Sequence, residues 1–533
     1  MATYVWTVVR VGSAAVSVMK PLPGRCVRQM SVRSRLYEHV RAGYSDRPEL
    51  DMSPVCEDPE RVTENLQNRK ADLQGHDVRS MVQVWRDLEA VRKHISELEE
   101  QKSGVSKAVK ELAIKNNNKA HKTLPEVTQI LQRGRDLRHQ LNDLYLQESE
   151  LEEKHYTQAL RLPNTTHPDV PVGDESRARL VELVGQKPEF DFEPRGHVEL
   201  GEELGIIRQR HLAHVSGHRS YYLRGAGARL QTALQNFALD KLQQLGFVPL
   251  VVPDLLRGVV FEGCGMRPDA HLSQVYSLDP DRFPDLNLAG TGEVGVAGFF
   301  MDHAVSRKDL PVRTVCSSTC YRAETDTGRE TWGLYRVHHF TKVEMFGVTA
   351  NETGQESAQL LDEFVSLQKE IFSALELHCR SVGLSPVRFR VSESDLRSPF
   401  VLRVLDMPTE ELGAPAHRKY DIEAWMPGRN SYGEISSGSN CTDYQSRRLN
   451  ILYERDDGSL TYAHTVNATA CAIPRTIIAI LETHQTKEGT VRVPRALQPY
   501  LGLETIEKPK SSPLRYIGPN QRFKPTRAAP RTT

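Results

Sequence analysis

Two stretches in the first third of the 533-residue chain carry a regular hydrophobic pattern. The first places apolar residues three or four positions apart, at Met81, Trp85, Leu88, Val91, Ile95 and Leu98. The second continues at Val127, Ile130, Leu137, Leu141, Leu144 and Leu151. This spacing gives each helix one apolar face. Because the polar run 115–119 and Pro125 interrupt the pattern, residues 60–165 are predicted to form an antiparallel coiled-coil arm, roughly 50 Å long.

The remainder of the chain alternates helical and strand patterns. Residues 226–245 predict a helix, residues 246–253 a strand stopped by proline, and residues 473–485 a strongly apolar helix. Short β-rich runs follow one another at 313–321, 340–348, 420–426 and 449–454, with a further strand near Arg403. Strands separated by loops favour an α+β domain built on an antiparallel sheet with flanking helices, placed at 218–503.

Three other segments are expected to lack a core of their own. Residues 37–59 and 166–217 are proline-containing linkers, and 504–533 is a tail rich in Pro, Lys and Arg. The whole chain has 69 Lys plus Arg and 69 Asp plus Glu, so any surface for nucleic acid must be local. No apolar run approaches the roughly 20 residues that span a bilayer, so no membrane partner is expected. The eight scattered cysteines suggest free thiols in a reducing compartment.

The first 37 residues contain no Asp or Glu but several basic residues, at Arg10, Lys20, Arg25, Arg28, Arg33 and Arg35. A basic, serine-containing and acid-free segment is typical of a mitochondrial transit peptide. We therefore assign residues 1–36 to such a peptide, with cleavage near residues 33–36 and the mitochondrial matrix as destination. The alternative is a basic tail without a targeting role.

The end of the predicted arm is basic. It carries Lys102, Lys107, Lys110, Lys115, Lys119 and Lys122, with Glu111 as the one acid between them. Such a run is either a solvated surface or a grip for phosphates held away from the body.

Two further segments have the composition of a ligand site. Arg322 and Glu324 lie two residues apart on one predicted strand, and Phe340, Lys342 and Glu344 alternate on the next. A strand face bearing these groups is costly to bury without a ligand, and it suits an anion, a flat base and an ammonium group. The alternative is an ordinary surface hairpin.

These segments belong to a series of five motifs in order. Residues 320–345 resemble motif 2 of the class II aminoacyl-tRNA synthetases in its seryl form, Arg-x-Glu followed by Gly-Leu-x-Arg-x-His-x-Phe-x-Lys-x-Glu. Residues 432–448 resemble the seryl Glu-Ile-Ser-Ser segment, and 464–475 resemble motif 3. Residues 288–294, with Thr291-Gly292-Glu293, match the serine-recognition loop, and 162–173 resemble the junction of arm and body. The resemblance covers about residues 60–502.

The resemblance implies a ligase that activates serine with ATP and Mg²⁺ as seryl-adenylate and transfers it to tRNA(Ser). Arg322 would hold the α-phosphate and Arg475 the γ-phosphate, while Phe340 stacks on adenine. Glu434 would help to hold Mg²⁺. The implied ATP-binding residues are Arg322, Ala323, Glu324, Val337, Phe340, Glu434, Ile435, Ser436, Ser437 and Arg475. The implied residues around L-serine are Thr291, Gly292, Glu293, Arg322, Glu344 and Thr469. For tRNA they are Lys107, Lys110, Lys115 and Lys119.

The resemblance also implies a homodimer, and it leaves open whether tRNA(Sec) is a second substrate. Motif 3 departs from the family by Ala468, Ala470 and Pro474 in place of glycines and by Thr469 in place of serine. The motif 2 loop is one residue shorter than usual, and residues 379–402 are an atypical insert. These departures keep two rivals open, namely a non-catalytic relative that binds RNA or serves as a scaffold, and a coiled-coil interaction protein. Cys316, Cys320, His338 and His339 lack the usual spacing of zinc ligands.

Overall fold

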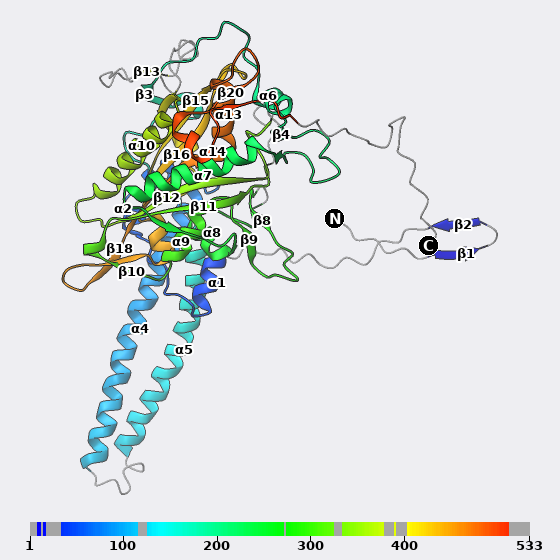
Figure 1. Cartoon of the computed structure of the whole chain (residues 1–533). Coiled ribbons are helices and arrows are strands. Elements are labelled where there is room, and N and C mark those ends of the chain that lie inside the picture. Colours follow the sequence, from blue (N-terminus) through cyan, green and yellow to red (C-terminus); the bar gives the residue numbers. More distant parts are fainter. Residues whose placement is uncertain are drawn as a thin grey trace, which may run out of the picture.

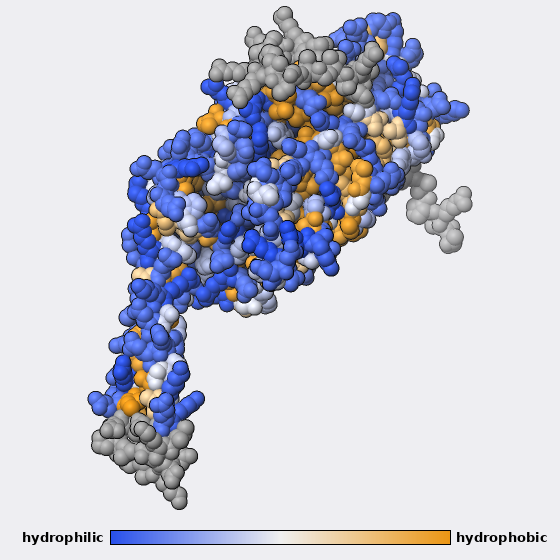
Figure 2. Space-filling view, turned by 90° about the vertical axis from the view of Figure 1, so that its left-hand side faces the viewer, coloured by the Kyte–Doolittle hydropathy of each residue, from blue (hydrophilic) through white to orange (hydrophobic). Residues whose placement is uncertain are grey.

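A globular body and a projecting pair of helices make up the molecule (Figure 1). The computed structural model describes residues 8–11, 14–17, 34–115, 125–270, 273–324, 333–377, 389–390 and 402–510. The predicted arm is present as α4 (Gly75–Lys115) and α5 (Pro125–Ala159). Leu98, Leu137 and Leu141 are buried between the two helices, as the apolar spacing predicts. Figure 2 shows that the arm surface is mainly hydrophilic.

The base of the arm is wider than predicted. Helices α2 (Ser53–Glu57) and α3 (Pro59–Asn68) pack against the start of α4, burying residues such as Met52 and Leu66. Helix α1 (Arg35–Arg41) packs on α8 (Gly258–Gly263) of the body. Residues 37–59 therefore contain helical structure, and describing them as a linker was wrong. Short amphipathic helices beside prolines gave no periodic signal long enough to identify.

The body is organised around one large sheet. Among the described residues its nine strands lie in the order β13-β3-β14-β15-β16-β19-β12-β11-β6, antiparallel except for the β6–β11 pair. The strands are β3 (Arg179–Val184), β6 (Val248–Leu250), β11 (Val312–Tyr321), β12 (His339–Thr349), β13 (Phe389–Arg390), β14 (Leu402–Asp406), β15 (Arg418–Met426), β16 (Ser431–Thr442) and β19 (His464–Ala472). The predicted α+β class with an antiparallel sheet is confirmed.

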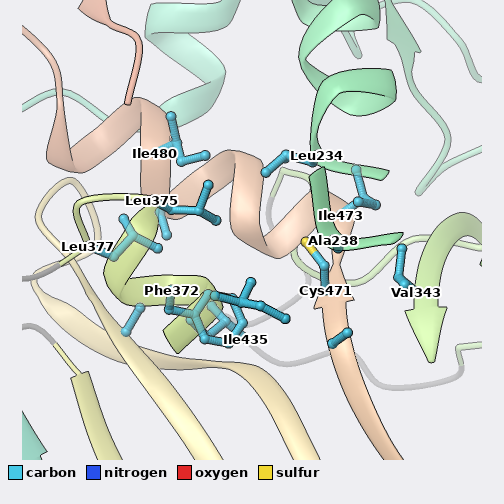
Figure 3. Close-up of a cluster of buried hydrophobic side chains, with 14 of the residues drawn as sticks. Leu234, Ala238, Val343, Phe372, Leu375, Leu377, Ile435, Cys471, Ile473 and Ile480 are labelled. Atoms are coloured by element: carbon cyan, nitrogen blue, oxygen red, sulfur yellow. The ribbon is translucent and has the colours of Figure 1, made fainter. Parts of the chain in front are cut away.

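In the part of the chain that the structure describes, three long helices cover one face of this sheet. They are α7 (Ala226–Gln244), α10 (Glu356–Ala374) and α13 (Ile473–Thr483). Figure 3 shows their apolar side chains meeting Val343 and Ile435 from the sheet, with Leu234, Phe372 and Ile480 among them. Alternation along β12 turns Val343 towards these helices and Phe340, Lys342 and Glu344 to the other face. That other face is left to a second hydrophobic cluster and to the site described below.

Several predicted boundaries need correction. Residues 166–217 are not a linker, because they supply β3 to the central sheet and α6 (His197–Glu203) to its helical cover. The predicted strand at 449–454 shortens to β17 (Leu452–Glu454), since Leu449 ends helix α12 (Tyr444–Leu449). Of the expected tail, β21 (Thr505–Ile506) pairs with β20 (Val491–Arg492).

Two other predicted segments lie largely outside the described residues. Within 1–36 the described residues are 8–11, 14–17 and 34–36. The first two groups form a hairpin of β1 (Val8–Val11) and β2 (Ala14–Ser17). Within the insert 379–402 the described residues are β13, which pairs with β3, and Leu402, the first residue of β14. Across the described residues, none of the helices has the length and apolar character that crossing a bilayer requires.

Candidate active site

A polar pocket opens where β12, β16 and the start of α13 meet. The segment that follows the motif 2 loop forms one wall. The lining residues are Arg322, Glu324, Leu334, Tyr335, Arg336, Val337, Phe340, Lys342, Glu434, Ile435, Ser436, Ser437, Thr469, Ala472, Pro474 and Arg475. The two arginines that lie 153 positions apart in the sequence (475 minus 322) therefore share one cavity.

Arg475 is fixed in the first turn of α13. Its Nη1 donates to the Glu434 carboxylate at 2.9 Å and to the Glu434 carbonyl at 3.0 Å, and its Nε donates to the Tyr335 carbonyl at 3.2 Å. The guanidinium also stacks on the Tyr335 ring, 4.4 Å from its centre. Burial lowers its pKa, but Glu434 and Tyr335 outweigh burial and raise it, so the charge is permanent.

Arg322 follows the end of β11 directly, so the prediction that Arg322 and Glu324 lie on one strand was wrong. Its Nε donates to the Gly290 carbonyl at 3.2 Å, and its guanidinium lies 5.3 Å from the centre of the Phe340 ring. Glu324 is buried, with Arg336 Nη1 3.7 Å from its Oε2. Among the described residues that Oε2 accepts no hydrogen bond, which leaves it available to a ligand.

Glu434 is a partly exposed, ionised carboxylate. Burial would raise its pKa, but Arg475, Lys419 and Arg322 lower it to about 2. Burial and the nearby Glu434 raise the pKa of Asp421 to about 7 against the pull of Lys419, and its Oδ1 has no hydrogen-bond partner among the described residues. Glu434 lines the cavity, and its carboxylate is the kind of hard oxygen donor that Mg²⁺ prefers. The donor set fits that ion.

A second group of acids lies deeper, around Glu293. This residue sits in the first turn of α9 (Gly292–Phe300), next to the N-cap Thr291. Its Oε1 accepts hydrogen bonds from Gln445 at 2.6 Å and Asn467 at 2.8 Å. Burial and the neighbouring Glu344 raise its pKa to about 7.

Glu344 faces this group from β12. Its Oε2 lies 2.6 Å from Lys342 Nζ and accepts a hydrogen bond from Thr469 at 3.4 Å. Gly292 allows the start of α9 to approach β11 closely, because a Cβ at this position would lie 2.6 Å from the Cys316 sulfur. Carboxylates with a hydroxyl beside them suit a small ligand that carries an ammonium and a hydroxyl group.

The titration of Glu293 predicts a pH dependence. Only the ionised carboxylate attracts an ammonium group, so kcat/KM for such a ligand should fall about tenfold per pH unit below pH 7. Other charged groups facing Glu293 are Glu344, Lys342 and Arg322. Steady-state kinetics from pH 5.5 to 8.5 check this. Glu293→Gln should flatten the acidic limb at lower activity, and an unchanged limb would contradict the assignment. Asp421→Asn should leave this limb in place, separating the two groups.

The structure gathers most of the predicted residues. Ten of them line the pocket, and Gly292, Glu293 and Glu344 lie in the adjoining acidic group. Thr291 faces a neighbouring cavity that it shares with Arg322. Ala323 does not line the pocket, and its N–H donates to the Gln274 carbonyl at 2.9 Å. Lys107 and Lys110 are exposed on the arm, whereas the Lys115 side chain and Lys119 lie outside the description.

Sequence reasoning missed several members of the site. Tyr335 and Arg336 line the pocket, and Gln445 and Asn467 donate hydrogen bonds to Glu293. The position of Tyr335 inside motif 2 was an available signal. The altered motif 3 glycines are accommodated, because Ala468 and Ala470 are buried in β19 without positive φ, and Pro474 occupies the first turn of α13.

Two family models match the chain. The class II core domain of tRNA synthetases (G, H, P, S and T) matches residues 276–484, and the N-terminal domain of seryl-tRNA synthetases matches residues 50–166.

Relatives of known name match nearly the whole chain. The mitochondrial serine–tRNA ligase of Mus musculus is 57% identical, with 94% of each chain covered. That of Bos taurus is also 57% identical, covering 92% of this chain and 90% of the relative. The bacterial serine–tRNA ligase of Rubrobacter xylanophilus is 38% identical over 86% of this chain and 99% of its own.

Solved structures agree. Seryl-tRNA synthetase from Pyrococcus horikoshii complexed with ATP superimposes with a TM-score of 0.73 at 32% identity, covering 87% of this chain and 100% of that one. With motifs, arm, sheet and pocket in the same order, the chain belongs to the seryl-tRNA synthetase family of class II aminoacyl-tRNA synthetases.

Proposed function

We propose that this protein is a serine–tRNA ligase that joins serine to tRNA(Ser) through seryl-adenylate. One observation carries the proposal: Arg322 and Arg475 line a single pocket, and the acidic group around Glu293 adjoins it. The relatives named as serine–tRNA ligases and the neighbour solved with ATP support this reading. We propose ATP, L-serine and tRNA(Ser) as the substrates.

The chemistry requires positioning and charge stabilisation. The serine carboxylate attacks the α-phosphorus and displaces pyrophosphate, and negative charge grows on the phosphate oxygens in the transition state. Arg322 would stabilise that charge, and Arg475 would hold the γ-phosphate so that the triphosphate stays bent. Phe340 and Glu324 would bind the adenosine. The terminal ribose hydroxyl of tRNA then attacks the carbonyl carbon of seryl-adenylate, forming the ester and releasing AMP, and no side chain need become covalently attached.

We propose that Mg²⁺ binds in this pocket, because a carboxylate that suits this ion lines it. Glu434, with Ser437 beside it, would hold the ion, whose chemistry is to neutralise phosphate charge. Arg475 keeps Glu434 ionised and therefore able to take part.

Recognition of serine would rest on polar groups that are buried. Glu293 and Glu344 would bind the ammonium group, and Thr469 would meet the hydroxyl. Alanine would leave these groups unpaired, so a site built to bond a hydroxyl rejects it strongly.

The arm is proposed to bind the tRNA at a distance from the body. Lys107, Lys110, Lys115 and Lys119 would contact phosphates near its end.

We propose a homodimer as well, because the edge strand β6 exposes Val248 and, just beyond this strand, Val251 is 99% exposed. Figure 2 shows hydrophobic patches on one face of the body.

The mitochondrial matrix is the proposed location. Two relatives named as mitochondrial and the acid-free composition of residues 1–33 support it. Because Ser34 caps α1 and Leu36 is 1% exposed, we place cleavage of the transit peptide before Ser34.

Amino-acid-dependent exchange of pyrophosphate into ATP tests the activity. Serine should support exchange, while alanine should be at least about 10³-fold poorer in kcat/KM, because alanine leaves buried polar groups unpaired. Absence of exchange with every amino acid would contradict the proposal and favour a non-catalytic relative.

A further inference from the structure

Helix α12 (Tyr444–Leu449) contacts both the arm and the acidic group around Glu293. It is six residues long and largely buried, and it packs against α8, α9, β16 and β19. Gln445 and Arg448 are three residues apart and therefore lie on neighbouring positions of the helix surface. Their partners belong to different parts of the molecule.

Arg448 holds the end of the arm. Its Nη2 donates to the Leu162 carbonyl at 3.0 Å and approaches the Leu160 carbonyl at 3.5 Å, just beyond the last residue of α5. A helix end leaves carbonyls unpaired and carries partial negative charge, which a guanidinium satisfies. Arg448 is 7% exposed, and among the described residues no carboxylate forms an ion pair with it. Its Nη1 donates to the Tyr444 carbonyl at 3.0 Å, so Arg448 joins the first residue of α12 to the end of the arm.

Gln445, on the same helix, binds the carboxylate of Glu293. Its Nε2 donates to Glu293 Oε1 at 2.6 Å, and its Oε1 accepts a hydrogen bond from Thr465 at 2.7 Å. The side chain is 0% exposed, so its orientation is fixed by these two bonds. A displacement of α12 would therefore move the Glu293 carboxylate relative to Glu344.

We propose that α12 couples the arm to the serine pocket, with Arg448 reading the position of α5 and Gln445 adjusting Glu293. This inference rests on the proposed roles of the arm in tRNA binding and of Glu293 in serine binding. A tRNA that shifts the arm changes the affinity for serine, and serine changes the affinity for tRNA by the same factor. Arg448 and Gln445 are positioning residues in this scheme.

The test measures serine affinity by equilibrium dialysis with radiolabelled serine. Full-length enzyme is used alone and with saturating serine tRNA whose terminal ribose has been oxidised by periodate, so that it accepts no amino acid. The two dissociation constants should differ at least about fivefold in the wild-type enzyme, the lower end of ordinary coupling. In Arg448→Met the ratio should fall to about 1, with tRNA-free affinity within about twofold of wild type.

Arg69→Met is the matched control. Arg69 is also 7% exposed, and it donates to the Asn164 carbonyl at the arm base and to the Ala416 carbonyl of the body. Its hydrogen bonds all go to residues outside α12, although the Tyr444 side chain lies near enough to influence its pKa. This variant should keep the wild-type ratio. A ratio of 1 in the wild-type enzyme, or equal loss in both variants, would overturn the proposal.

Two more variants guard against misfolding. Arg448→Lys retains the positive charge but lacks the planar fork of guanidinium donors, so the ratio of the two serine dissociation constants should be intermediate. Gln445→Met leaves the arm contact intact, and it should weaken serine binding with and without tRNA while bringing the ratio to about 1. An unchanged ratio in either variant overturns the proposal. Serine-dependent exchange by the wild-type enzyme is measured alongside, so failure of the proposed function is seen separately.

Discussion

Replacing Arg322 by glutamine is expected to lower kcat for serine-dependent ATP–pyrophosphate exchange about 10³-fold, the cost of losing one charge-stabilising donor. The guanidinium lies between the Gly290 carbonyl and the Phe340 ring, so its direction is set before ATP arrives. Lysine at this position keeps a charge but loses the planar fork. Arg322→Lys should therefore recover only part of the loss.

The matched control lies on the same strand. Arg313, at the start of β11, donates to Glu363 through Nε and Nη2 at 2.8 Å each, and it lies outside the pocket. Arg313→Gln should leave kcat within about twofold. A loss confined to KM for ATP in Arg322→Gln would mean that this arginine binds ground state and transition state equally, and would contradict its assigned role.

The sequence predicted the site better than it predicted the edges of the fold. Phe340, Lys342 and Glu344 occupy alternate positions of β12 and therefore share one face of the strand, as predicted. The motifs also predicted that Arg322 and Arg475 would lie in one pocket, and both line it. The long central strands β16 and β19 were not predicted as strands, whereas local periodicity did predict β11, β12, β15 and α13. Their boundaries were correct to within two residues at 313–321, 340–348, 420–426 and 473–485.

What sequence could not supply depends on partners far along the chain. β3 has an irregular burial pattern, and it is a strand because β14 pairs with it more than 200 residues later. Gln445 is an ordinary polar residue until α12 places it beside Glu293. The helical base of the arm was missed for the same reason, since Leu36 and Met52 are buried by contacts with distant segments.

Removing the outer arm should separate the two half-reactions. Deleting residues 96–144 and joining Ile95 to Tyr145 through Gly-Ser-Gly-Ser spans the roughly 10 Å between packed helices. The shortened arm keeps the ion pair of Arg92 with Glu148 and Glu152 as its new end, together with the base cluster that contains Met81. Serine-dependent exchange should stay within about threefold of wild type, because every pocket residue remains.

Charging of tRNA(Ser), by contrast, should fall at least about 10³-fold in kcat/KM in this deletion variant. The arm would supply phosphate contacts that hold the tRNA far from the chemistry, and losing several of them weakens binding steeply. Lys107→Glu with Lys110→Glu in the full-length chain should weaken charging in the same direction, more strongly at low salt, with exchange unchanged. If the deletion variant charged tRNA at the wild-type rate, the arm would have no part in tRNA binding, and the body alone would have to recognise the tRNA.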